Sequence, residues 1–66
     1  MSEQIITVQA RMLSIGDIWQ DSDVVTLVGQ SHRPGLLDVT FRNRDTNRTR
    51  VEQWPRIRWV QIKRQG

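Results

Sequence analysis

Arginine and tryptophan side chains are concentrated in residues 43–59, NRDTNRTRVEQWPRIRW, which hold five arginines, two tryptophans and one proline. Guanidinium groups bind phosphate through paired hydrogen bonds and also stack on nucleobases. An exposed indole ring offers a platform for an unpaired base. The segment therefore indicates an anion-binding surface, with nucleic-acid phosphates as the first candidate ligand.

Seven residues in and beside this segment form the predicted nucleic-acid-binding site. They are Arg42, Arg44, Arg48, Arg50, Trp54, Arg56 and Arg58. The arginines are predicted to contact phosphates, and a tryptophan would stack on a base if its ring is exposed. A chain this small needs aromatic rings in its core, so we expect at least one of Trp54 and Trp59 to be buried. Which of the two is buried stays open at this stage.

The two halves of the chain carry charge of opposite sign, within a net charge of +3. Residues 1–32 contain one arginine and four acids, whereas residues 33–66 contain nine basic side chains and three acids. This asymmetry favours an anionic partner. The alternative to nucleic acid is an acidic protein, which would make the chain a protein-interaction or assembly module, such as a small phage or mobile-element product.

Residue types for catalysis and metal binding are sparse. The chain has no cysteine, and His32 is its one histidine. The serines have no evident base beside them. Asp17, Asp21 and Asp23 alternate as in a cation loop, but the glycine and final glutamate of an EF-hand are missing. We therefore expect a protein that is not an enzyme and that has no metal site, no cofactor and no small-molecule substrate.

The length of 66 residues predicts a single domain over residues 1–66, with flexible ends at residues 1–4 and 64–66. A domain of this size buries only about 60% of the surface that its unfolded chain exposes. Forming a homo-oligomer is one way to bury more. The start, MSEQ, is polar, and no apolar run has the length of a signal core or a membrane span. These features predict a soluble, cytoplasmic protein with no membrane partner.

Short runs rich in Val, Ile, Thr and aromatic residues alternate with turn signals, and no run has the periodicity of an amphipathic helix. The pattern predicts an all-β fold. Gly29 is expected at a bulge, and Gly35 is expected to adopt positive φ in the turn HRPG. The five predicted strands cover residues 5–11, 24–29, 36–43, 49–54 and 57–63.

The register of the hairpin between the third and fourth strands can be argued from side-chain alternation. A three-residue loop, Asp45-Thr46-Asn47, places Asn47 in the left-handed conformation that Asn tolerates. It also pairs inward-facing Phe41 with Val51 and sets Arg42 opposite Arg50. Like charges directly opposite each other destabilise a hairpin, which favours a role for this pair in binding an anion.

The order of these elements resembles an SH3-like barrel, with a wide first turn, tight central hairpins and a break at QWPR. The resemblance implies a small five-stranded antiparallel barrel with a 3₁₀ turn at that break. An OB-like barrel is the rival, but no segment suits the helix it normally carries. SH3-like barrels bind proline-rich peptides, other proteins, RNA and DNA, so the resemblance does not select a function.

Overall fold

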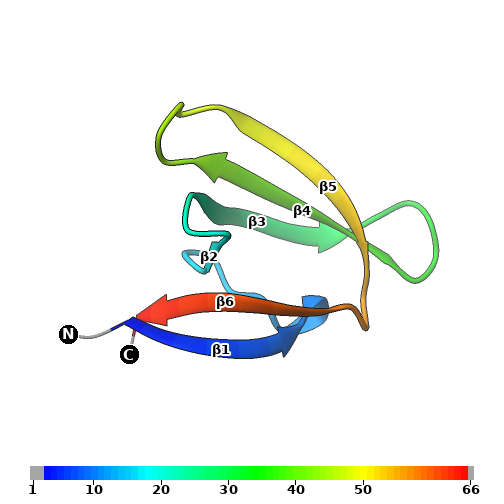
Figure 1. The fold of residues 1–66 in the computed structure, drawn as a ribbon. Helices are drawn as coiled ribbons and strands as arrows, with labels where there is room; N and C mark the ends of the chain where they lie inside the picture. Colours follow the sequence, from blue (N-terminus) through cyan, green and yellow to red (C-terminus); the bar gives the residue numbers. More distant parts are fainter. Residues whose placement is uncertain (1–2, 66) are drawn as a thin grey trace.

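The chain folds into one curved antiparallel β-sheet, in a computed structural model that describes residues 3–65. Its elements are β1 (Glu3–Gln9), η1 (Ala10–Met12, a 3₁₀ turn), β2 (Ile18–Trp19), β3 (Asp23–Gln30), β4 (Leu36–Asn43), β5 (Thr49–Pro55) and β6 (Trp59–Gln65). The strand order across the sheet is β1-β6-β2-β3-β4-β5. In Figure 1, β1 and β6 form one layer, β3 to β5 form the other, and β2 lies between them. The prediction of an all-β antiparallel fold is confirmed.

The sheet differs in detail from the predicted five-stranded barrel. The short strand β2 is additional and pairs with both β3 and β6. Within the described residues, β1 and β5 are the two edges of the sheet and do not pair, so the sheet is open and the term barrel fits it only loosely. The 3₁₀ turn lies at η1, at the end of the segment predicted as the first strand. At QWPR, β5 instead continues through Pro55, and the Arg58 N–H closes the following turn on the Pro55 carbonyl.

Strand pairing extends closer to both chain ends than predicted. Glu3 pairs with Gln65, and Gln4 pairs with Arg64. Residues 3–4 and 64–65 therefore belong to the paired strands β1 and β6, and the flexibility expected for residues 1–4 and 64–66 stays a prediction. Residues 1–2 and 66, which the same expectation covers, lie outside the described residues.

Two turn residues adopt the predicted left-handed conformations, whereas the predicted bulge lies elsewhere. Gly35 has a φ of +79° in the β3–β4 turn, and Asn47 has a φ of +60° in the β4–β5 loop. The register shift in β3 falls between Val25 and Leu27 instead of at Gly29. A bulge needs no glycine when the extra residue keeps negative φ, so composition alone does not locate it.

Three aromatic rings occupy the centre of the core. The Trp19 and Trp54 rings are 4.9 Å apart, and each lies within 5.4 Å of the Phe41 ring. Trp54 is 2% exposed, whereas Trp59 is 65% exposed. The expectation that at least one of these two tryptophans is buried is confirmed. Buried aliphatic residues complete the core: Ala10, Val25, Leu37, Val39, Val60 and Ile62.

The β4–β5 hairpin adopts a register one residue away from the predicted one. The Asn43 N–H donates to the Arg48 carbonyl at 2.8 Å, so the loop contains four residues, 44–47, rather than three. Phe41 consequently pairs with Arg50 instead of Val51. Because side chains alternate between faces, this slip turns every side chain of β5 to the other face of the sheet.

The slip changes the environment of the hairpin arginines. Arg42 pairs with Thr49, so the predicted opposition of Arg42 and Arg50 is wrong. Val51, expected in the core, is 60% exposed, and Trp54 is buried. The two residues have opposite parity on β5, so only one of them can face inward. Burying an indole removes far more apolar surface from water than burying a valine, which favours the observed register.

Candidate functional site

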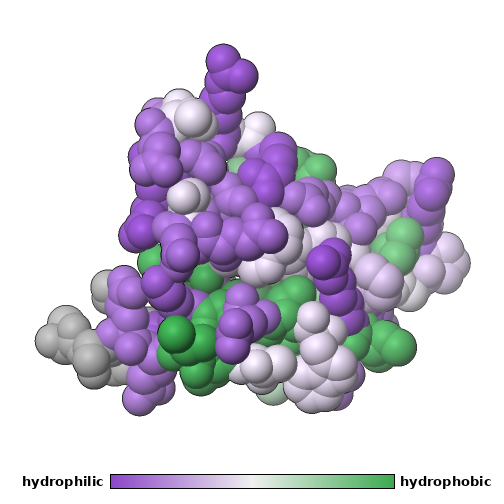
Figure 2. All heavy atoms as spheres, in the orientation of Figure 1, coloured by the Kyte–Doolittle hydropathy of each residue, from purple (hydrophilic) through white to green (hydrophobic). Residues whose placement is uncertain are grey.

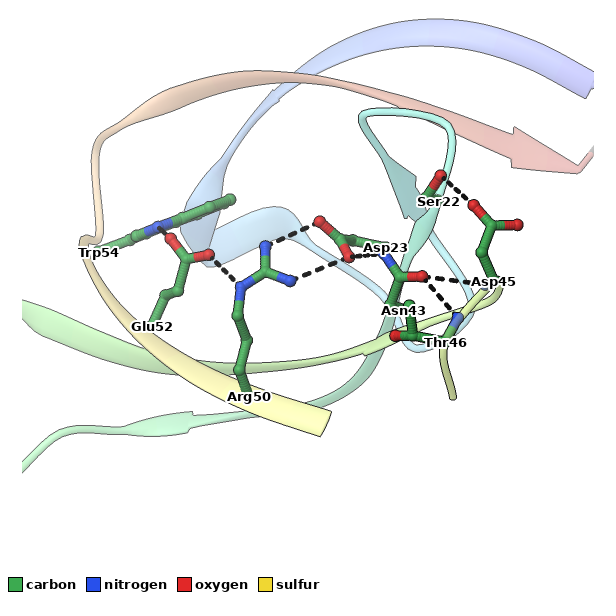
Figure 3. A network of polar contacts seen from close by, with 8 residues as sticks. All are labelled: Ser22, Asp23, Asn43, Asp45, Thr46, Arg50, Glu52 and Trp54. Carbon is green, nitrogen blue, oxygen red and sulfur yellow. Dashed lines mark hydrogen bonds and ion pairs between the residues drawn. The ribbon is translucent and has the colours of Figure 1, made fainter. Parts of the chain in front are cut away.

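Arg50 points into the space between the two layers and is bound by carboxylates of the protein itself (Figure 3). Its Nη1 and Nη2 donate to the two carboxylate oxygens of Asp23, at 3.0 and 2.7 Å, and its Nε donates to Glu52 Oε2 at 2.8 Å. The guanidinium also lies 5.3 Å from the centre of the Phe41 ring. The Asp23 side chain is only 7% exposed, so this bidentate pair replaces the water that the carboxylate has lost.

Trp54 belongs to the same network and presents no open ring face to a ligand. Its Nε1 donates to Glu52 Oε1 at 3.0 Å, so Glu52 links the indole to Arg50 (Figure 3). The guanidinium of Arg58 covers the ring at 4.5 Å. Arg50 and Trp54 therefore stabilise the fold.

The pKa of Asp23 lies below its ordinary value of 3.8, chiefly because Arg50 donates hydrogen bonds to the carboxylate. Burial acts in the opposite direction, and the amide of Asn43 adds a smaller lowering contribution. The same contacts raise the pKa of Arg50. The ionised pair is thus the preferred state in the folded protein.

This network predicts loss of stability in acid. A carboxyl whose pKa is lower in the folded state stabilises the fold fully above the unfolded pKa, and this contribution disappears as the pH falls through the folded pKa. We expect the urea midpoint to be level from about pH 7 to about pH 5 and to fall below about pH 4. Urea titrations monitored by circular dichroism would measure it. The urea midpoint of Arg50→Ala should fall less steeply with decreasing pH than that of the wild type. Equal slopes would contradict a stabilising role for the Asp23–Arg50 pair.

Three of the predicted arginines lie near the loop of the β4–β5 hairpin. We call them the hairpin tip: Arg42, Arg44 and Arg48. Acidic residues are mixed with them there. The Arg44 N–H donates to the Ser22 carbonyl at 2.8 Å, and its guanidinium donates to the Asp21 carbonyl at 2.6 Å. Asp45 accepts a hydrogen bond from the Ser22 hydroxyl, and Asp21 forms an ion pair with Lys63. Charges of both signs therefore alternate around the tip.

An open cleft of about 480 Å³ lies beside this mixed region, between β2 and β6. Its lining includes Ile5, Trp19 and the ion-paired side chains of Asp21 and Lys63. Because the charged side chains that line this cleft among the described residues neutralise each other, it has no excess of positive charge.

The opposite end of the molecule, at the β5–β6 turn, is basic without admixed acids. The Arg11 N–H donates to the Arg56 carbonyl at 3.1 Å, and the Arg56 N–H donates to the Gly35 carbonyl at 3.1 Å. These bonds bring together three segments that contain no acidic residue: residues 9–13, 30–36 and 55–60. We call this region the basic end, and its arginines are Arg11, Arg33, Arg56 and Arg58.

Exposed apolar side chains accompany these arginines. Ile57 is 69% exposed and Trp59 is 65% exposed. An open cleft of about 470 Å³ is lined by Arg11, Gly35, Pro55, Arg56 and Ile57. In Figure 2 the part of the visible face over β1 and β6 shows hydrophobic and pale residues among hydrophilic ones, whereas the part over the β4–β5 hairpin is mostly hydrophilic. The basic end therefore combines cations with apolar surface, as sites for nucleic acid and for protein both do.

The structure divides the seven predicted residues into three groups. Arg42, Arg44 and Arg48 lie at the hairpin tip, Arg50 and Trp54 lie in the interior network, and Arg56 and Arg58 lie at the basic end. The tip and the basic end are separated by β5, a length of about 20 Å for a seven-residue strand. They do not form one continuous site.

Three residues of the basic end were absent from the predicted set: Arg11, Arg33 and Trp59. Arg11 and Arg33 are distant in sequence from the arginine-rich segment, and only the fold brings them beside Arg56. A signal was nevertheless present for Trp59. Val60 and Ile62 lie on the same face of β6 and are both buried. Trp59 immediately precedes Val60, so alternation along the strand places it on the solvent face.

Comparisons of the chain with protein-family models, with curated proteins and with solved structures find no match. Within the described residues, no three acidic or histidine side chains are grouped so that they could hold a metal ion. The same part of the chain contains no helix with the length and apolarity needed to span a membrane.

Proposed function

We propose that the protein is a small, non-catalytic binding module that contacts nucleic-acid phosphates through the basic end. The observation that carries this proposal is the meeting of four arginines and an exposed tryptophan in three segments without an acid. Phosphates are the anions that guanidinium groups bind in bidentate fashion. Phosphate contacts supply most of the affinity in sequence-independent binding.

Two arginines of the predicted set belong to the basic end, together with two arginines that were not in that set. Arg56 and Arg58 remain candidate phosphate ligands, now joined by Arg11 and Arg33. Arg58 is already oriented by its stacking on Trp54. The hairpin tip is a secondary contact at most in this proposal, because the acids beside it weaken its attraction for phosphate.

Salt dependence tests this function directly. Four arginine contacts to a single-stranded oligonucleotide predict that log K falls with log salt concentration with a slope of about −3, through counterion release. Fluorescence anisotropy with labelled DNA and RNA at about 50 to 200 mM salt measures this slope. Phosphate contacts strongly affect the affinity over this range of salt concentration. Absence of any binding to single-stranded or double-stranded DNA and RNA at low salt would refute the proposal.

An acidic protein is the second candidate partner, because exposed Ile57 and Trp59 beside Arg56 also have the composition of an interface hot spot. Protein and nucleic-acid ligands differ in their requirement for phosphate. Poly-L-glutamate that competes with oligonucleotides at equal charge concentration would favour the protein partner. Competition by nucleic acid alone would favour the first proposal.

A further inference from the structure

Trp59 is an aromatic side chain on the solvent face of a regular strand pair. It is the first residue of β6 and lies opposite Gln9, the last residue of β1. The following pair on the same face, Thr7 and Gln61, is polar and exposed. The indole therefore lies on the solvent face of β6 beside polar neighbours of the strand pair, with 65% of its surface open.

Hydrogen bonds connect a cation to the residue that pairs with Trp59. Gln9 Oε1 accepts a hydrogen bond from Arg11 Nε at 2.9 Å, and Gln9 Nε2 donates to the Ile57 carbonyl at 3.4 Å. Gln9 is the residue paired with Trp59, so the guanidinium of Arg11 is bonded to the side chain opposite the indole on β1. Among residues 3–65, the two Nη groups of Arg11 have no hydrogen-bond partner.

A second feature extends the surface beyond the ring. The cleft of about 470 Å³ is lined by Arg11 and Ile57 together with Pro55 and Arg56. Its lining is largely apolar apart from the two guanidinium groups. An exposed aromatic ring, a largely apolar cleft and two arginines thus belong to the basic end.

This arrangement suits unpaired nucleotides better than a duplex. A duplex exposes its phosphates but keeps the faces of its bases stacked, and inserting a side chain between base pairs requires them to unstack. Trp59 belongs to a strand and pairs with Gln9, so its ring is not carried on a loop that could reach between stacked bases. A single strand presents its base faces freely, and stacking on an aromatic ring tolerates any base.

We propose that the ligand of the basic end is a single-stranded nucleic acid, with one unpaired base stacked on Trp59 and adjacent phosphates bound by Arg11 and Arg56. This inference rests on the proposed function and specifies its substrate class. The apolar cleft beside Ile57 accommodates a neighbouring base. Recognition of this kind depends on base faces rather than base edges, so it has little sequence preference.

The test compares a labelled 12-nucleotide oligothymidine with a 12-base-pair duplex by fluorescence anisotropy at low salt. We expect the single strand to bind at least about fivefold more tightly. Trp59→Ala should weaken single-strand binding by about 5- to 150-fold, the range that corresponds to losing one stacked base. It should change duplex binding by less than about twofold, and Trp59→Phe should retain part of the single-strand affinity.

Val51→Ala is the matched control, because Val51 is a similarly exposed apolar residue, 60% open, on another face of the protein. It should leave all affinities unchanged. Tryptophan fluorescence supplies an independent readout, since a stacked base should quench the wild type and should not quench Trp59→Phe. Circular dichroism confirms that each variant is folded.

The possible results separate the two proposals. Equal affinity for single strand and duplex, with Trp59→Ala affecting neither, would overturn the single-strand inference and leave phosphate binding intact. Binding to neither nucleic acid would overturn both. Binding to poly-L-glutamate as strong as binding to oligothymidine would also overturn the inference, because no base is then required.

Discussion

Replacing Arg11 and Arg56 together by glutamine should weaken oligonucleotide binding by about 10- to 100-fold, since each charge-assisted hydrogen bond to phosphate is worth about 1.5–3 kcal/mol before partial compensation. The two guanidinium groups line the cleft at the basic end, and no acidic side chain is among the described residues that line it. The slope of log K against log salt concentration should also become less steep, by about 0.7 for each phosphate of a single strand that the variant no longer neutralises.

The double variant Arg42→Gln with Arg48→Gln at the hairpin tip is the matched control. Like the first variant, it removes two positive charges from exposed positions. A partner that responds only to net charge should therefore bind both variants equally. We expect the tip variant to bind within about threefold of the wild type, since long-range attraction is screened beyond about 10 Å. A larger loss for the tip variant than for Arg11→Gln with Arg56→Gln would place the phosphate contacts at the hairpin instead.

Replacing Arg50 by alanine should lower the free energy of unfolding by about 1–3 kcal/mol. Breaking a fully buried pair costs about 3–5 kcal/mol because a charge is left uncompensated, but the Arg50 side chain is 43% exposed, so water recovers part of this loss. Among the side chains that the structure describes, Asn43 alone would still donate a hydrogen bond to Asp23. A core of this size rarely supplies more than about 3–5 kcal/mol, so the effect is a large fraction of the total.

The sign of this change also tests the hairpin register. If Arg42 stood opposite Arg50, removing one of them would relieve repulsion and stabilise the protein by a few tenths of a kcal/mol or more. Urea denaturation of Arg50→Ala distinguishes the two registers. Arg42 is exposed and pairs with Thr49, so Arg42→Ala should have a free energy of unfolding within about 0.5 kcal/mol of the wild type. If Arg50→Ala fails to fold, the double variant Arg50→Met with Asp23→Leu should restore folding, because it leaves neither charge alone.

Local pattern was sufficient to predict most strands and some of the turns. The alternation of Leu37, Val39 and Phe41 correctly predicted the inward face of β4, and Asn47 correctly predicted a left-handed residue in the following loop. These features depend on residues close together in sequence, for which side-chain period and backbone preference are direct guides. The additional strand β2, only two residues long, is too short to produce such a pattern.

The register of β5 could not be obtained in the same way. Val51 and Trp54 compete for the inward face, and the choice depends on whether the core has room for an indole. The rings of Phe41 and Trp19 form the site into which the Trp54 indole packs. The same register turns Arg50 inward, where it binds Asp23, which is 27 residues away in the sequence. A contact over that distance has no local signature.

The amino-acid sequence alone establishes an antiparallel β-protein with an excess of arginine in its second half, because strand periodicity and charge are properties of short segments. It does not distinguish an arginine that binds a ligand from one that binds the protein's own carboxylate. The folded chain makes this distinction. It binds Arg50 to Asp23 and Glu52, and it brings together Arg11, Arg33 and Arg56 from three separate segments that contain no acid. The physical reason is that the environment of a charge is set by its neighbours in space, and these neighbours come from strands and turns far apart in the sequence.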